Sequence, residues 1–298
     1  MDLDKYRALI CALDCGSISA AAEHLQYTPS GISRMLSALE SELGFPLLVR
    51  EHSGVRATAE CELMLPLIRR LIHCGESCMQ LSARIRGLEY GSVTVATAYS
   101  AFYPWLAELT SEFHALHPGL QVQLRSGYSS ELSALVAERQ IDLAIISRRE
   151  GAENWLPICE DEMVAWVPGG HPLAAGDSVP VESFAREAYI ETYPNADIDN
   201  TRVFSRCGIT PNLQFSTMDS YATCAMVDAG LGISMNNAIN SLARSGNVRI
   251  MPLDPPQRVE LGIAYPSDAS PAARAFLDYI RERLPDARKY TRQVGAGD

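Results

Sequence analysis

The segment from Ser17 to Gly44 constrains the fold of this chain most, because it carries start and stop signals for two successive helices. Ser17 is a good N-cap for a short helix over 18–25 that is rich in alanine, whose small side chains let helices approach closely. Thr28 caps a second helix that begins at Pro29, where the missing N–H costs nothing, and Gly44 ends it. An amphipathic helix over 3–14 precedes the pair, so the segment predicts a helix-turn-helix.

The helix from Pro29 to Leu43 has two different faces. Apolar side chains recur along one face at helical spacing, as expected of a helix that packs on a core. The opposite face carries short hydrogen-bond donors and one arginine, namely Ser30, Ser33, Arg34 and Ser37. A face free of bulky apolar groups suits the major groove of DNA, and Arg34 is the best candidate for contact with a base edge or a phosphate.

A hairpin is predicted directly after this helix. Two short apolar runs flank a turn at residues 51–54, which makes the hairpin a candidate wing. Arg56 beside its tip is expected to contact a phosphate or the minor groove. Arg50 contacts DNA or, alternatively, bonds a carboxylate such as Glu40.

Residues 58–88 have a helical pattern with a heptad seam. The apolar positions step by four and three residues; they are Leu67, Leu71, Cys74, Cys78, Leu81, Ile85 and Leu88. Such a seam needs a partner helix and therefore predicts dimerisation. Pro66 lies inside the pattern, so the helix either kinks there or begins later than Thr58.

From Ser92 onward, short apolar strands alternate with helices. This rhythm indicates an α/β region with a largely parallel sheet. The overall class is therefore α/β, with an all-α winged helix-turn-helix before it.

Composition limits the function classes. The net charge is −11, and residues 1–90 hold nine basic against eleven acidic side chains, so non-specific affinity for nucleic acid should be weak. No run of apolar residues is long enough to span a membrane and no signal peptide is evident, so we expect a cytoplasmic protein with no membrane partner. No catalytic motif or metal-ligand spacing appears, so we expect no enzyme activity, metal or cofactor.

The stretch SISAAAEHLQYTPSGISRMLSALESELGFPLLVR at 17–50 resembles the LysR-type transcriptional regulators almost position by position. FHALHPGLQVQL, IDLAII, HPLA at 171–174 and GLGIS at 230–234 resemble the effector-binding domain of that family. The resemblance implies a winged helix-turn-helix over 1–58 and a linker helix with a hinge over 59–90. It also implies an effector domain like periplasmic binding proteins over 91–298, with one lobe over 91–163 and 265–298 and the other over 164–264.

The resemblance further implies partners and DNA contacts. Promoter DNA, a small-molecule effector, RNA polymerase and further copies in a homodimer or homotetramer are the expected partners. The DNA-binding set is Ser17, Thr28, Pro29, Ser30, Ser33, Arg34, Ser37, Arg50 and Arg56.

Candidate effector ligands follow the strands of the α/β region. Ligands bind outside the carboxyl ends of strands in such folds, and the polar and aromatic residues there also match family ligand positions. The set is Tyr99, Ser100, Tyr128, Ser129, Ser147, Arg148, Thr192, Asn195 and Thr217. Arg148 favours an anionic effector, and the tyrosines are compatible with an aromatic one.

Two alternatives stay open at this point. The α/β lobes could form an enzyme or a carrier whose N-terminal helices serve only oligomerisation. The protein could also be a redox sensor that uses Cys207 and Cys224, although neither lies in a basic cluster.

Overall fold

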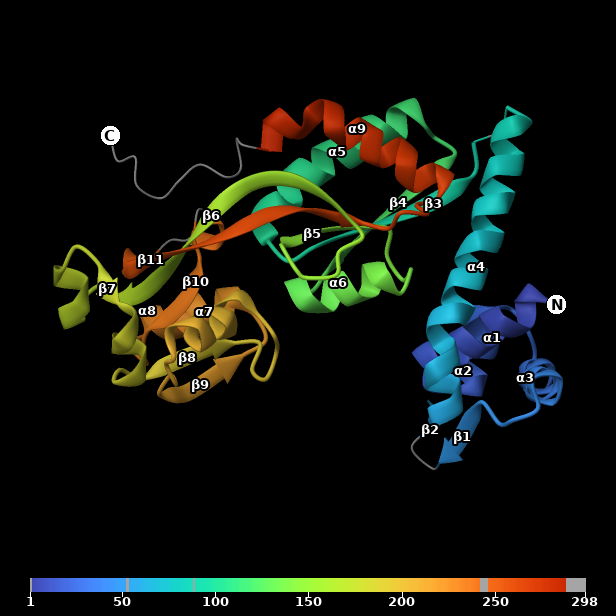
Figure 1. Cartoon of the computed structure of the whole chain (residues 1–298), viewed down its shortest axis with the longest axis horizontal. Helices are drawn as coiled ribbons and strands as arrows, with labels where there is room; N and C mark the ends of the chain where they lie inside the picture. The colour runs from blue at the N-terminus through green and yellow to red at the C-terminus, as the bar shows by residue number, and fades with distance from the viewer. Residues whose placement is uncertain (1, 52–53, 88, 242–245, 288–298) are drawn as a thin grey trace. The chain divides into compact units, whose positions relative to one another are not determined.

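The computed structural model describes residues 2–51, 54–87, 89–241 and 246–287, and Figure 1 shows the elements they form. Two compact units make up the chain. The first comprises the residues up to Tyr90 together with Glu138–Gln140, and the second comprises the rest from Gly91 onward. No helix in the described ranges is long and apolar enough to cross a membrane.

Three short helices open the first unit: α1 (Leu3–Asp14), α2 (Ile18–His24) and α3 (Pro29–Leu43). The predicted caps are confirmed, since the Thr28 hydroxyl accepts from the Gly31 amide and Gly44 has the left-handed conformation at φ 85°. The apolar stripe of α3 lies in the core of the unit, where Ile32 and Leu39 are buried beside Leu9 of α1. Burial of this stripe leaves the opposite side of α3 for solvent.

The predicted hairpin forms strands β1 (Leu48–Glu51) and β2 (Gly54–Ala57), which pair antiparallel. The Val55 amide donates to the Gly16 carbonyl at 2.9 Å, which ties the hairpin to the turn between α1 and α2. Gly54 has φ 129°, and a Cβ there would lie 2.4 Å from the Gly16 oxygen, so only glycine fits.

Helix α4 (Ala59–Ile85) follows the hairpin, with the Thr58 hydroxyl capping it at the Cys61 amide. It begins immediately after Thr58, so the predicted alternative of a later start is wrong. Pro66 lies inside the helix, where it removes one backbone hydrogen bond. The cap and the packing of Cys61 and Ile68 on the first unit's core support a helix across this residue.

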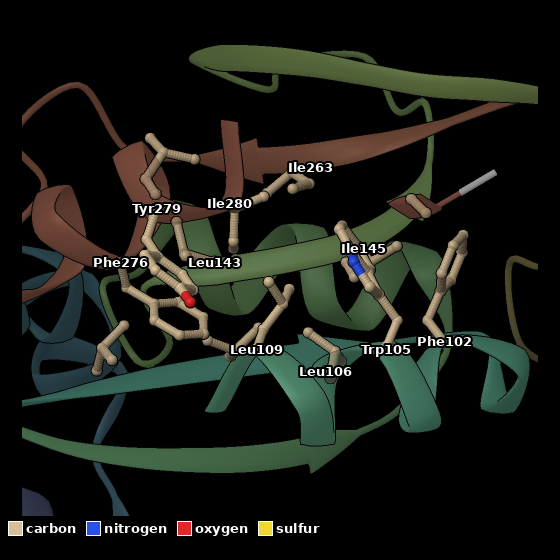
Figure 2. Close-up of a cluster of buried hydrophobic side chains, with 14 of the residues drawn as sticks. Phe102, Trp105, Leu106, Leu109, Leu143, Ile145, Ile263, Phe276, Tyr279 and Ile280 are labelled. Carbon is tan, nitrogen blue, oxygen red and sulfur yellow. The ribbon is translucent and has the colours of Figure 1, made fainter. Parts of the chain in front are cut away.

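The second unit has two lobes. The first lobe contains β3 (Gly91–Thr97), α5 (Tyr103–Leu116), β4 (Leu120–Ser126), α6 (Ser129–Ala137), β5 (Leu143–Ser147) and α9 (Pro271–Ala287). Strand β3 pairs parallel with both β4 and β5. Figure 2 shows side chains of α5, α9 and β5 converging in its core, including Trp105, Phe276 and Ile145. Helix α6 packs on the other face through Leu132 and Val136.

Two long strands, β6 (Asn154–Pro168) and β11 (Val248–Tyr265), run through both lobes. They pair antiparallel from Asn154 opposite Tyr265 to Pro168 opposite Val248, with a register shift between Pro252 and Gln257. The sheet order is β10-β6-β11-β5-β3-β4. The prediction of a largely parallel sheet is therefore wrong, because this sheet is mixed. Strand β3 pairs parallel with β4 and β5, and β11 pairs parallel with β7 (Val179–Pro180), but β11 pairs antiparallel with β5 and β6, and β6 pairs antiparallel with β10.

The second lobe is built around the far ends of these strands. Its elements are β7 (Val179–Pro180), β8 (Tyr189–Thr192), α7 (Asp199–Cys207), β9 (Leu213–Thr217), α8 (Ser220–Asp228) and β10 (Ser234–Asn237). Alternate residues of β6 enter two cores. Met163 and Ala165 join one core, and Val164 and Trp166 join the other. Two lobes that share continuous strands can tilt about those strands, as ligand-responsive domains do.

Candidate functional site

The solvent-facing side of α3 is the candidate site of the first unit. Ser30, Arg34 and Ser37 are exposed there, and Ser33 is half-buried. The Arg34 Nε donates weakly to the Ser30 carbonyl at 3.4 Å, which holds the guanidinium along the helix, and Arg34 has no acidic partner among the described residues. The surface thus presents a positive charge among hydroxyl groups.

Two predicted residues at the helix starts act as caps. The Ser17 hydroxyl accepts from the Ala20 amide at 3.4 Å, and the Thr28 hydroxyl accepts from Gly31 at 3.1 Å. Both hydroxyls retain donor capacity, and the Thr28 oxygen lies 3.2 Å from that of Ser30. Exposed Pro29 begins α3 beside them.

The hairpin adds a second cation. Arg56 is exposed on β2. Arg50 lies on β1, but its side chain is outside the described residues. Glu40 accepts from the Leu47 and Leu48 amides at 2.8 and 3.3 Å, so this carboxylate anchors the start of the hairpin through its backbone.

Most of the heptad seam on α4 is exposed. Leu67, Cys74, Cys78, Leu81 and Ile85 are exposed, Leu71 packs partly on the core of the first unit, and Leu88 is outside the described residues. Leu81 is 50% exposed and Ile85 78%. A run of large apolar side chains in water is a surface that gains free energy when it is covered.

The second unit contains a cavity of about 650 Å³ lined by both of its lobes. Cavities of 300–1,000 Å³ are typical of small-molecule sites. Five residues of the predicted effector set line it, namely Tyr99, Ser100, Tyr128, Ser129 and Thr192. Ser147 lies behind the wall, bonded to Ser129, while Asn195 and Thr217 are not part of the lining.

The predicted arginine is not in the cavity, but its neighbour is. Arg148 is 60% exposed and pairs with Glu260 at 3.0 Å. Arg149 is buried and lines the cavity, where its Nη2 lies 3.0 Å from the Asp199 carboxylate. Arg149 shares a side of the chain with Ser147, two residues earlier, and this period of two was a signal that could have identified it.

A buried polar network joins the two lobes at Asp199. Its carboxylate accepts four hydrogen bonds, from the Ser147 hydroxyl at 2.6 Å, the Tyr99 hydroxyl at 2.9 Å, Arg149 at 3.0 Å and the Asn237 amide at 3.3 Å. Tyr99, Ser147 and Arg149 belong to the first lobe, whereas Asp199 and Asn237 belong to the second. Burial, followed by the charge of Asp199, raises the pKa of the Tyr99 hydroxyl, so it stays a donor. Asp199 and Asn237 were not predicted. Asp199 begins α7 and follows no strand, whereas Asn237 ends β10, so the strand-end rule could have identified it.

A second salt bridge extends this network to the surface. The Asp197 carboxylate accepts from the Ser130 hydroxyl at 2.8 Å and from two nitrogens of Arg202. Hydrogen bonds from Arg202 lower the pKa of Asp197 to about 2. The start of α7 is therefore bonded to the first lobe through two acidic residues, Asp197 and Asp199.

A further acid lies behind the cavity, in the crossover strand β6. Asp161 is buried, and its Oδ1 accepts from the Ile239 amide at 3.1 Å, while its Oδ2 has no hydrogen-bond partner among the described residues. Burial raises the pKa of Asp161 to about 7. This carboxyl therefore titrates near neutral pH, beside the strands that join the lobes.

The two cysteines considered for redox sensing lie in different cores. Cys207 packs partly against the core that contains Met163, and Cys224 is buried in the core that contains Trp166. Neither forms a disulfide with another described cysteine. Within the described ranges, no group of three or more His, Cys, Asp or Glu side chains could hold a metal ion.

Comparison with known families and structures accounts for nearly the whole chain. Residues 3–62 match "Bacterial regulatory helix-turn-helix protein, lysR family", and residues 86–285 match "LysR substrate binding domain". YvbU, an uncharacterised HTH-type transcriptional regulator of Bacillus subtilis, is 25% identical over 290 residues, which cover 95% of this chain and 98% of YvbU.

Two further proteins show the same organisation. MetR, an HTH-type transcriptional regulator of Escherichia coli, is 27% identical over 83% of this chain and 79% of MetR. A full-length OxyR from Pseudomonas aeruginosa superposes with a TM-score of 0.69 at 19% identity, covering 95% of this chain and 94% of OxyR. At this identity the OxyR structure shows the shared fold alone.

Proposed function

The chain belongs to the LysR family of DNA-binding transcriptional regulators, and from this premise we propose which surfaces read DNA and sense the effector. The solvent-facing side of α3 enters the major groove of promoter DNA, with the β1–β2 hairpin against the backbone. The cavity of the second unit binds the small molecule that modulates this activity. The observation that carries the DNA assignment is the exposed Arg34 among hydroxyl groups on α3.

The DNA face uses different groups for affinity and for specificity. Arg34, with Ser30 and Ser37 on the same exposed side, offers donors to base edges, where sequence is read. Arg56 on the hairpin offers a charge to phosphate. A net charge of −11 leaves little general attraction to DNA, so these few contacts per subunit predict a shallow dependence on salt.

The seam on α4 supports a homodimer. Leu67, Leu81 and Ile85 are exposed apolar residues spaced as in a coiled coil, and a second copy of the same helix would cover them. Two subunits double the number of DNA contacts and restore the affinity that one acidic subunit lacks.

Effector binding is proposed to act through the bonds that join the lobes. Asp199 of the second lobe is held by Tyr99, Ser147 and Arg149 of the first, directly at the cavity wall. A ligand that binds one lobe arrangement more tightly than another shifts the population toward it. The change in DNA affinity is then limited by the difference between the ligand's affinities for the two lobe arrangements.

The proposal is tested by binding assays on the full chain. A mobility-shift titration compares the DNA fragment upstream of the protein's own gene with an unrelated fragment of equal length and at equal salt. We expect specific binding to be at least a thousandfold tighter. Equal affinity for both fragments would overturn the DNA assignment, whereas a metabolite screen in which no compound raises the melting temperature would overturn the effector assignment.

A further inference from the structure

The charged groups at the cavity argue against the anionic effector that an arginine first suggests. Among the described lining residues, the charged ones are Arg149, Asp199 and Asp219. Each nitrogen of the Arg149 guanidinium already donates a hydrogen bond within the protein: Nε to Ser130, Nη1 to Ser147 and Nη2 to Asp199. The charge of Arg149 is already paired with the buried Asp199 carboxylate, so an anionic ligand would have to compete with Asp199 for it.

The other charged residue, Asp219, is exposed and has no cationic partner among the described residues. Its Oδ1 caps α8 by accepting from the Ala222 amide at 2.8 Å. Asp219 joins none of the ion pairs formed among the described residues. With the Arg149–Asp199 pair neutral overall, Asp219 gives the lining a net negative charge, which attracts a cation.

Four tyrosines share the cavity with this acid. Tyr103, Tyr128, Tyr193 and Tyr221 line the cavity along with Asp219. The rings of Tyr128 and Tyr193 have centroids 5.8 Å apart and are tilted by 43°, so the two form a corner of aromatic surface. The Tyr193 amide donates to the Thr217 carbonyl and the Asp219 amide donates to the Thr217 hydroxyl at 3.2 Å, so both residues lie next to Thr217. Burial and then the charge of Asp219 raise the pKa of Tyr193. The faces of such rings attract cations.

The backbone that presents Tyr193 is strained, which is unusual for a bulky residue. Tyr193 has φ 59° and Asn195 has φ 64°, so two non-glycine residues adopt the left-handed conformation within three positions. The Tyr193 amide donates to the Thr217 carbonyl at 2.8 Å, which holds this turn. Strain that the surrounding fold maintains is typical of ligand-binding loops.

We propose that the cavity binds an organic cation, an alkylammonium group held against the faces of Tyr128 and Tyr193 and beside the Asp219 carboxylate. This inference deepens the proposed effector function and rests on it. The remaining hydroxyl and amide groups of the lining, such as Ser100 and Asn236, would bond the polar part of the molecule. The charge and the rings together select against carboxylate ligands of the same size.

The test uses three probes of one shape on the full chain by isothermal titration calorimetry. Choline carries the trimethylammonium group, and neohexanol is its neutral carbon isostere. The third probe, tert-butylacetate (the 3,3-dimethylbutanoate anion, not the tert-butyl ester), is a carboxylate of similar size. We expect choline to bind at least tenfold more tightly than neohexanol, and tert-butylacetate not to compete with it. The proposal is overturned if choline gives no binding, if neohexanol binds equally well, or if the carboxylate binds more tightly.

Three variants locate the binding, one at Asp219 and a matched pair at Tyr193. Asp219→Asn keeps the cap of α8, because asparagine caps helices as well as aspartate does, and it should weaken choline binding about fivefold or more while leaving neohexanol unchanged. Tyr193→Phe keeps the ring and should bind choline like the wild type, whereas Tyr193→Leu should lose about tenfold. The site would be contradicted if Asp219→Asn and Tyr193→Leu both bound choline with the affinity of the wild type.

A parallel mobility shift separates this inference from the proposed function. If tert-butylacetate binds the cavity and alters the affinity for the upstream fragment, the effector function stands and the cation assignment fails. If choline binds as expected but leaves DNA affinity unchanged, the cation site stands and its role as the effector site fails.

Discussion

Replacing Arg149 with methionine should strongly destabilise the second unit. The substitution removes the partner of a carboxylate whose side chain is 6% exposed, together with the hydrogen bonds from Arg149 to Ser130 and Ser147. Breaking a buried ion pair on one side costs about 3–5 kcal/mol, because the remaining charge stays buried without compensation. Methionine fills a similar volume, so the loss reports the removed charge and hydrogen bonds rather than a cavity.

The neighbouring arginine supplies a matched control. Arg148→Met removes the same charge one residue away, but Arg148 is 60% exposed and its partner Glu260 is 36% exposed. Exposed pairs contribute up to about 1 kcal/mol, so this variant should unfold nearly like the wild type.

Urea unfolding followed by tryptophan fluorescence measures both variants in the full chain. The three tryptophans, Trp105, Trp155 and Trp166, all lie in the second unit, so their emission follows that unit alone. The double variant Arg149→Met with Asp199→Asn removes both charges, and we expect it to regain about 1–3 kcal/mol of the loss. Equal midpoints for Arg149→Met and Arg148→Met, or additive effects in the double variant, would refute the reasoning.

Three other predictions concern single positions. Because the pKa of Asp161 is about 7 in the folded chain and near its model-peptide value of about 3.9 when unfolded, the native state holds the extra proton between these values. Stability should therefore fall by about 2–3 kcal/mol from pH 5 to pH 7, and Asp161→Asn should remove that part of the slope in urea titrations. Leu81→Glu on the exposed seam should convert dimers into monomers in analytical ultracentrifugation, and an unchanged dimer would exclude the seam. Gly54→Ala should cost the first unit about 1–3 kcal/mol in thermal unfolding followed by circular dichroism, since its Cβ would collide with the Gly16 carbonyl, whereas an unchanged transition would contradict the constraint.

The first unit was predictable because its signals are local. Thr28, Pro29 and Gly44 each act through their own backbone geometry or through a hydrogen bond to a nearby residue, and the structure places α3 between them as expected. The apolar stripe then decides which side is buried. The exposed position of Arg34 follows from the sequence without knowledge of any long-range contact.

The crossover strands were harder to predict because pairing with a distant strand determines them. Within the two crossover strands, the sequence pattern predicts strand only at residues 163–167 and 259–265. In the structure, β6 begins at Asn154 and β11 begins at Val248. Acidic residues interrupt the apolar pattern of β6, and prolines interrupt that of β11. The register shift between Pro252 and Gln257 accommodates those prolines, which cannot donate to the ladder.

The cavity was predicted on one side only. The strand-end rule identified Tyr99 and Ser129, because parallel strands bring their carboxyl ends to one edge. Asp199 reaches the same place from the second lobe, through a helix whose position depends on the crossover strands. No local pattern around Asp199 reveals that its partners are Tyr99 and Arg149.

The central claim, that the exposed side of α3 reads DNA sequence, is tested most directly by one comparison. The affinities of wild type and Arg34→Ala are measured at fixed salt for the upstream fragment and for unrelated DNA, with exposed Arg274→Ala in α9 as a control of equal charge. The account predicts that Arg34→Ala loses about 1–3 kcal/mol on the upstream fragment and little on unrelated DNA, while Arg274→Ala loses none on either. Unchanged affinity of Arg34→Ala for the upstream fragment would contradict it.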